Sequence, residues 1–227
     1  MNSHNKNNRE ERTTVIVIAI IISIAIVFAA ISIAMLVPFH YGSGTAGFGS
    51  GKSGISSSTF SISNASFQKM NSIPTGVLVN KSNNTIIVSS NEVKIIVEAA
   101  PTWYPKNGDF WLIYGLVNPT IIIKDNTTIN FVFINMDNIT HMPAITTASP
   151  PYSYMPMQQD MMGYGGNTGS WPAIGPMLAG TSAGGANTTY VATDLSMAFD
   201  SIGNYYYICL IPGHAEMGMY GEISVIA

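Results

Sequence analysis

Short runs of β-branched and aromatic residues, separated by Asn, Pro, Gly and Asp, fill the chain from about residue 85 to its end. The runs have the length and composition of β-strands, and no stretch between them shows a helical repeat of apolar residues. This pattern predicts an all-β sandwich. The predicted strands are Thr85–Ser90, Glu92–Ala100, Phe110–Val117, Thr120–Asp125, Thr128–Asp137, Thr189–Leu195, Asn204–Ile211 and Gly221–Ala227.

One long segment interrupts this series of strands. Residues 149–187 are rich in Pro, Gly, Tyr and Met, and they follow neither the strand period nor the helix period. Structureless segments of more than about 15 residues are uncommon in compact domains unless they are functional or disordered. We interpret the segment as a long insertion, which is either a lid or docking surface or a stretch without direct chemistry.

An uncharged apolar run occupies residues 15–37. A helix of this length would extend for about 35 Å, enough to cross the roughly 30 Å hydrocarbon core of a bilayer. A cleavable signal peptide has a shorter apolar region, of about 7–15 residues, so we favour a retained transmembrane anchor. Lys6, Arg9 and Arg12 precede the run, and the next Lys or Arg after it is Lys52, which predicts a cytoplasmic N-terminus and an outward-facing remainder.

These features divide the chain into four parts. Residues 1–14 form a cytoplasmic N-terminus, residues 15–37 the membrane anchor, and residues 38–63 a Gly- and Ser-rich flexible linker. The remaining residues, 64–227, suffice for one globular domain with a sizeable core. We therefore expect a single outward-facing β-domain tethered to a membrane.

Charged residues make up 9% of the chain, against about 25% in average soluble proteins. The chain has no basic cluster with interleaved aromatic residues, which excludes a nucleic-acid-binding protein. Few carboxylates also leave few native ion pairs for acid to disrupt, so an acidic external habitat is one explanation of the composition. Compositional drift is the other.

The candidate chemistry lies near the C-terminus, in the sequence CLIPGHAEMGM. Cys209 is the single cysteine of the chain, so it has no internal disulfide partner, and a free thiol on an oxidising exterior is a liability unless a metal binds it. His214 follows a Pro-Gly turn, and Met217 and Met219 follow His214. A chain reversal after the strand would bring a histidine and one of the two methionines back to the thiol.

A thiolate, two imidazoles and a distant methionine sulfur form the blue-copper electron-transfer site. The second imidazole must come from elsewhere in the sequence. His4 and His40 flank the apolar run, whereas His141 follows a predicted core strand. The sequence therefore predicts a site for one copper ion, Cu(II) or Cu(I), at His141, Cys209, His214 and a methionine.

Other functions of the same residues are less well supported. A two-copper centre needs a second cysteine, and multicopper oxidases need more histidines than this chain has, while a Cys209 nucleophile with His214 as its base leaves His141 without a role. The alternative from another class is a copper chaperone or storage protein, since methionine clusters bind Cu(I). The methionines concerned are Met142, Met155, Met157, Met161, Met162 and Met177.

Two segments resemble a known family. YYYICLIPGHAEMGMYGEISV is similar to the copper loop of the rusticyanin and archaeal sulfocyanin cupredoxins, and FVFINMDNITHMPAI resembles the strand and first histidine of the same proteins. The resemblance implies a Greek-key cupredoxin sandwich with ligands His141, Cys209, His214 and Met219, because the family places its methionine five residues after the second histidine. Met217 is the rival axial ligand.

The resemblance also implies a biological role. A tethered cupredoxin of this kind carries single electrons in an acidophile's respiratory chain and is not an enzyme. Its partners are redox proteins such as a quinol-oxidising complex, a cytochrome or a terminal oxidase. Because the chain has few charges, we expect docking through the apolar and neutral surface around His214.

Two further residues are expected to shape the copper site. Asn135, at the end of the strand before His141, either forms hydrogen bonds around the thiolate, braces the ligand loops, or is a simple strand-end residue. Pro212 lacks a backbone N–H that would otherwise approach the sulfur. Few hydrogen bonds to the thiolate and a dry aromatic surround favour Cu(I), so we expect a high reduction potential.

Overall fold

The computed structural model describes residues 54–55, 58–157, 171–181 and 188–227, all within one compact unit, Gly51–Ala227. The predicted cytoplasmic N-terminus and anchor, residues 1–37, lie outside these residues. Within the described part of the chain, no helix is both long enough and apolar enough to cross a membrane. The anchor therefore stays a prediction from the sequence.

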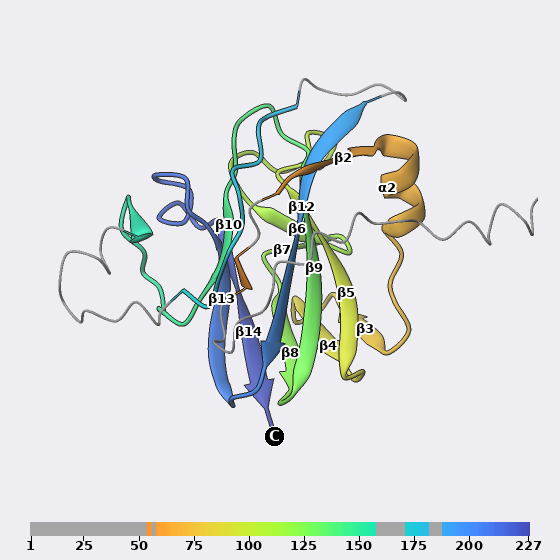
Figure 1. The fold of residues 1–227 in the computed structure, drawn as a ribbon, viewed down its shortest axis with the longest axis vertical. Helices are drawn as coiled ribbons and strands as arrows, with labels where there is room; N and C mark the ends of the chain where they lie inside the picture. Colours follow the sequence, from red (N-terminus) through yellow and green to blue (C-terminus); the bar gives the residue numbers. More distant parts are fainter. Residues whose placement is uncertain (1–53, 56–57, 158–170, 182–187) are drawn as a thin grey trace, which may run out of the picture. The chain divides into compact units, whose positions relative to one another are not determined.

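Two β-sheets make up the described domain, as the all-β prediction required (Figure 1). Sheet A has eight strands in the order β1 (Gly54–Ile55), β11 (Ala173–Ile174), β10 (Pro143–Thr146), β13 (Gly203–Cys209), β14 (Tyr220–Ile226), β8 (Thr120–Lys124), β4 (Thr85–Val88) and β3 (Val77–Asn80). Sheet B has six in the order β2 (Phe60–Ser63), β12 (Thr189–Phe199), β9 (Thr127–Asn135), β5 (Glu92–Ala99), β6 (Trp111–Ile113) and β7 (Leu116–Val117).

The strand pairing is mixed. β8 is parallel to both β14 and β4, and β5 is parallel to β9, whereas β13 is antiparallel to β10 and β14. In Figure 1, β12, β9 and β5 lie side by side. The chain passes from β9 in sheet B to β10 in sheet A, and His141 lies in this crossing.

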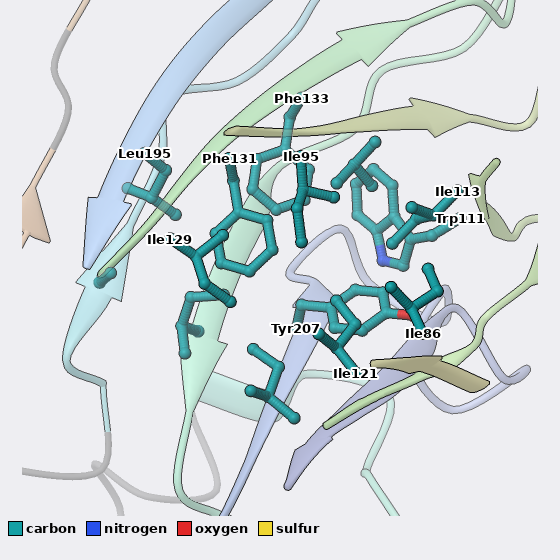
Figure 2. Packing of buried hydrophobic residues seen from close by; sticks show 14 of the residues in the cluster. Ile86, Ile95, Trp111, Ile113, Ile121, Ile129, Phe131, Phe133, Leu195 and Tyr207 are labelled. Atoms are coloured by element: carbon teal, nitrogen blue, oxygen red, sulfur yellow. The ribbon is translucent and has the colours of Figure 1, made fainter. Parts of the chain in front are cut away.

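The main core lies between the two sheets, because alternate residues of each strand point inward. Phe131 and Phe133 enter it from β9, Tyr207 from β13 and Trp111 from β6 (Figure 2). The Trp111 and Phe133 rings meet edge to face with centroids 5.2 Å apart, and the Tyr207 hydroxyl donates a 2.6 Å hydrogen bond to the carbonyl of Pro119. Large aromatic side chains from three strands therefore fill this core.

One predicted strand is corrected by the structure. The run 110–117 forms the two strands β6 and β7, with Leu112 opposite Val117. Tyr114 and Gly115, at the turn between them, have φ of 50° and 81°. A two-residue hairpin with positive φ at both positions is the turn that suits the twist of the flanking strands. The sequence pattern did not reveal this turn, because Tyr114 is an aromatic residue of the kind found within strands.

The end of the predicted linker has regular structure. Within the predicted flexible linker, 38–63, Gly54–Ile55 form β1 and pair with β11, and Phe60–Ser63 form β2 and pair with β12. Ser63 then caps the short helix α2 (Asn64–Met70) by accepting a 3.2 Å hydrogen bond from the backbone N–H of Ser66. Phe67 of α2 is buried in a second apolar cluster, together with residues of β5, β9 and β12.

The predicted insertion, residues 149–187, contributes to sheet A where it is described. β11 pairs with β10 and with β1. Leu178 pairs with His141 in an isolated bridge, with N–H to O distances of 3.0 Å and 2.7 Å. Part of the insertion therefore supports a ligand residue through its backbone, which neither interpretation of the segment anticipated.

Candidate metal centre

Cys209 is the last residue of β13 and lies opposite Pro143 of β10. It belongs to the same core cluster as Tyr207, as expected for alternate residues on one face of a strand. Burial raises the pKa of its thiol to about 12, although the backbone N–H groups of Met142 and Ile211 donate to the sulfur and act in the opposite direction. The Met142 nitrogen lies 3.5 Å from Sγ. A metal ion is the partner that stabilises the thiolate at this buried position.

Two histidines direct their Nδ1 atoms at this sulfur. The distance from Sγ to Nδ1 is 3.7 Å for His141 and 3.5 Å for His214, and the two imidazole centroids are 5.1 Å apart. The three donor atoms lie within 4.8 Å of one another, and all three residues are buried. The sequence prediction named the three residues that the fold brings together.

The donor set and its spacing fit one transition-metal ion. Bonds of about 2.0 Å to nitrogen and about 2.3 Å to sulfur, at an angle near 110–120°, separate the two donor atoms by about 3.5–3.7 Å. The observed separations of 3.5 Å and 3.7 Å match this range. Two imidazoles and a thiolate in a trigonal arrangement are the donors of a blue-copper site.

Two carboxylates lie behind the histidines, and the sequence analysis did not anticipate them. The Nε2 atom of His141 is 3.3 Å from Oδ2 of Asp137, and that of His214 is 3.8 Å from Oδ2 of Asp109. A proton on Nε2 that faces a carboxylate leaves the Nδ1 lone pair free for a metal. Asp137 precedes His141 by four residues, a spacing visible in the sequence, whereas Asp109 is remote from His214 and gave no signal.

Burial keeps the first imidazole neutral. Desolvation lowers the pKa of His141 below its ordinary value, while the hydrogen bond with Asp137 acts against this shift. The neutral form of imidazole is the one that binds metals. The Trp111 ring packs against His141 with centroids 6.1 Å apart, so an aromatic surface covers this side of the site.

The two candidate axial methionines differ in burial. Met217 is 68% exposed, whereas Met219 is fully buried in the core cluster that contains Cys209. The backbone N–H of Met219 donates to the carbonyl of His214 at 2.9 Å, and its carbonyl accepts from the N–H of Cys209 at 3.1 Å. These positions favour Met219, and its role as axial ligand stays a prediction.

Asn135 braces the ligand loop, one of the three roles considered for it. The side chain is fully buried. Its Oδ1 atom accepts a 2.9 Å hydrogen bond from the N–H of Asp137. Its Nδ2 atom donates to the carbonyls of Ile139 (2.7 Å), Leu178 (2.8 Å) and Ala179 (3.0 Å).

Comparison with known proteins places this centre in a family. No family model matches the sequence. Rusticyanin from Acidithiobacillus ferrooxidans is 31% identical over 147 residues, which cover 63% of this chain and 68% of the relative. Rusticyanin from Acidithiobacillus ferridurans has the same identity and coverage. The chain belongs to the rusticyanin family.

Solved rusticyanin structures agree with this assignment. A rusticyanin from Thiobacillus ferrooxidans superimposes with a TM-score of 0.61 at 24% identity, covering 76% of this chain and 99% of the other. Reduced rusticyanin gives a TM-score of 0.55 at 26% identity and is covered completely, against 74% of this chain. The rusticyanin family member described here is therefore a cupredoxin with a type 1 copper site, an electron-transfer protein and not an enzyme.

Proposed function

We propose that this chain carries single electrons on the outer face of a membrane, with one copper ion bound by His141, Cys209, His214 and Met219. The observation that carries the proposal is the convergence of two buried Nδ1 atoms on one buried thiol at 3.5 Å and 3.7 Å. Such a site is fully occupied by protein ligands, so it favours outer-sphere electron transfer over binding of a substrate.

The membrane location rests on the sequence. The apolar run 15–37 and the positive residues before it favour a single anchor with its N-terminus in the cytoplasm. A Gly- and Ser-rich linker then joins the anchor to the copper domain. A carrier held in this way meets partners that lie within reach of the linker, such as a quinol-oxidising complex, a cytochrome or a terminal oxidase.

The surface beside the ligand loop suits docking with few charges. His214 is 7% exposed, so electrons would pass through a thin layer of protein at this position. Tyr154 and Met217 are both exposed, and both approach the backbone of Gly213, next to His214. These apolar side chains favour partner binding by contact of neutral surfaces. An electron-transfer rate that falls steeply with ionic strength would contradict this mode of docking.

The copper assignment is tested with the full-length chain loaded with one equivalent of Cu(II). We expect an intense thiolate-to-copper band in the visible spectrum, absent in Cys209→Ser and shifted in Met219→Leu. Met217→Leu is the matched control, because its side chain is exposed. A colourless loaded protein would refute the proposal, and several tightly held Cu(I) ions per chain would favour the chaperone or storage function instead.

The location is tested separately. Protease added to intact cells from which the outer wall has been removed should cleave the copper domain from the membrane fraction. Protection of the domain until the membrane is dissolved would place it in the cytoplasm and refute the outward orientation.

A further inference from the structure

Asn118 forms hydrogen bonds with Trp111 and with Gly218, on two sides of the copper site. It lies between β7 and β8 in a left-handed backbone conformation, with φ of 47°. Its Oδ1 atom accepts a 2.8 Å hydrogen bond from the backbone N–H of Trp111, and its Nδ2 atom donates a 2.8 Å hydrogen bond to the carbonyl of Gly218. Since one partner is an N–H and the other a carbonyl, the orientation of the amide is fixed.

The second of these hydrogen bonds acts on the peptide group before the axial candidate. The carbonyl of Gly218 and the N–H of Met219 belong to the same peptide plane. Its oxygen accepts from Nδ2 of Asn118 and, at 2.9 Å, from the backbone N–H of Tyr220, and its N–H donates to the carbonyl of His214 at 2.9 Å. The next peptide plane is held too, because the carbonyl of Met219 accepts from the N–H of Cys209 at 3.1 Å. With the planes on both sides held, the direction of the Met219 side chain from its Cα is fixed.

The first hydrogen bond, from the N–H of Trp111, acts on the other side of the copper site. Trp111 packs against the His141 ring at 6.1 Å and against Phe133 at 5.2 Å. The backbone N–H of Asn118 also donates to the carbonyl of Trp111 at 2.8 Å, so the two residues form a pair of hydrogen bonds. Asn118 thus links Trp111, which packs on the ligand His141, to the loop that carries Met219. Asn118 and its partner Gly218 in this loop are 100 residues apart in the sequence.

We propose that Asn118 is a positioning residue that sets the distance of the Met219 thioether from the copper. The inference rests on the proposed copper site. The axial ligand tunes the potential of blue-copper sites, and partners of ligands in such sites change metal affinity when they are lost. Among the described residues, the hydrogen bond from Asn118 to Gly218 is the one from a side-chain amide that joins the copper loop to the β7–β8 connection.

The residue type is specific for this role. Asparagine tolerates a positive φ better than most residues, and its amide offers one acceptor and two donor hydrogens. Aspartate keeps the acceptor for the Trp111 N–H but places a second oxygen against the Gly218 carbonyl. Glycine keeps the backbone conformation and loses both side-chain hydrogen bonds. The two substitutions therefore separate the effect on the copper loop from the effect on the backbone.

The test uses full-length Asn118→Asp and Asn118→Gly, each loaded with copper. The matched control is Asn84→Asp, because Asn84 also has a positive φ, of 51°, and donates from Nδ2 at 3.0 Å to the carbonyl of Val117. This carbonyl belongs to the peptide before Asn118, so the control reports the effect of disturbing that backbone without the loss of a hydrogen bond to the copper loop. We expect about tenfold weaker copper binding in both Asn118 variants, a higher potential, and an altered ratio of the visible bands. The control should match the unsubstituted protein.

A double-substitution cycle with Met219→Leu decides the mechanism. If Asn118 acts through the thioether, its substitution should leave the potential unchanged once Met219 is already leucine. An equal shift in both backgrounds, or a shift no larger than that of Asn84→Asp, would overturn the inference. That result differs from failure of the proposed function, in which the unsubstituted protein itself would lack the thiolate-to-copper band.

Discussion

Glu98 is a buried carboxyl group of β5, and its side chain reaches Asn71 at the end of α2. It is 1% exposed. The Nδ2 atom of Asn71 donates a 2.9 Å hydrogen bond to its Oε1 atom. The other oxygens of this pair, Oε2 of Glu98 and Oδ1 of Asn71, have no hydrogen-bond partner among the described residues. A buried carboxyl group with an unpaired oxygen favours uptake of a proton.

Burial raises the pKa of Glu98 from its ordinary value of 4.5 to about 7, and the hydrogen bond from Asn71 opposes this shift. A protonated Glu98 can donate to the free oxygen of Asn71, whereas the ionised form cannot. At about 1.4 kcal/mol for each tenfold change in proton affinity, the difference between the two pKa values corresponds to about 3 kcal/mol. Ionised Glu98 therefore destabilises the folded domain by this order of magnitude.

The sign of the pH dependence follows from the raised pKa. Below about pH 4.5 the group is protonated in both the folded and the unfolded chain, so it has no electrostatic cost. The cost grows as the pH rises and is complete above about pH 7. Glu98→Gln keeps the shape of the side chain and supplies a permanent hydrogen-bond donor. The stability of the variant relative to the unsubstituted protein should therefore be about 3 kcal/mol greater at pH 8 than at pH 4.

Chemical denaturation of the two proteins at pH 4, 6 and 8 measures this difference. Glu92→Gln is the matched control, since Glu92 is an exposed carboxylate on the same strand. The reasoning fails if Glu98→Gln changes the free energy of unfolding by the same amount at pH 4 and pH 8, or if the control shows an equal pH dependence.

Four further substitutions test the ligand loop, the core and the axial position. Asn135→Ala should cost about 2–4 kcal/mol of stability in denaturant unfolding and weaken copper binding, because three backbone carbonyls and the N–H of Asp137 each lose a hydrogen bond; a cost below 1 kcal/mol would contradict the bracing role. Gly221→Ala should lower the melting temperature measured by circular dichroism, since a Cβ there overlaps the Tyr207 phenol; an unchanged melting temperature would show that the ring can move. Met217→Leu should leave the potential of the copper centre unchanged in voltammetry, and Met219→Leu should raise it; the reverse result would exchange their roles.

The sequence predicted most of the strands that build the core, because their apolar residues follow the strand period. It missed β10 and β11, which contribute Ile145 and Ala173 to the core. It missed α2, whose seven residues are too few to show a helical period. It also read the segment 110–117 as one strand, since Tyr114 in a left-handed conformation looks like any other core aromatic. Local patterns of this kind fail where tertiary contacts decide the backbone.

The ligand loop was predictable because its residues are close together in the sequence. Cys209, His214 and the methionines lie within eleven residues, so their spacing alone indicates a metal. The groups behind the ligands come from distant parts of the chain. Asp109 reaches His214, and Asn118 reaches Gly218, only because the sheets pack together. Such contacts cannot be predicted from the spacing of residues in a single sequence.

The place where β2 joins sheet B has a geometric consequence for a chain anchored by residues 15–37. Phe60 pairs with Ala192 of β12, next to Val191, which pairs with Asn135 at the copper end of β9. β12 has 11 residues and is about 35 Å long, and its other end pairs with Thr127. Entry at the far end would add roughly this length to the span between bilayer and copper. With the proposed anchor, attachment at the near end would need a shorter tether to bring the redox centre to the membrane surface than attachment at the far end.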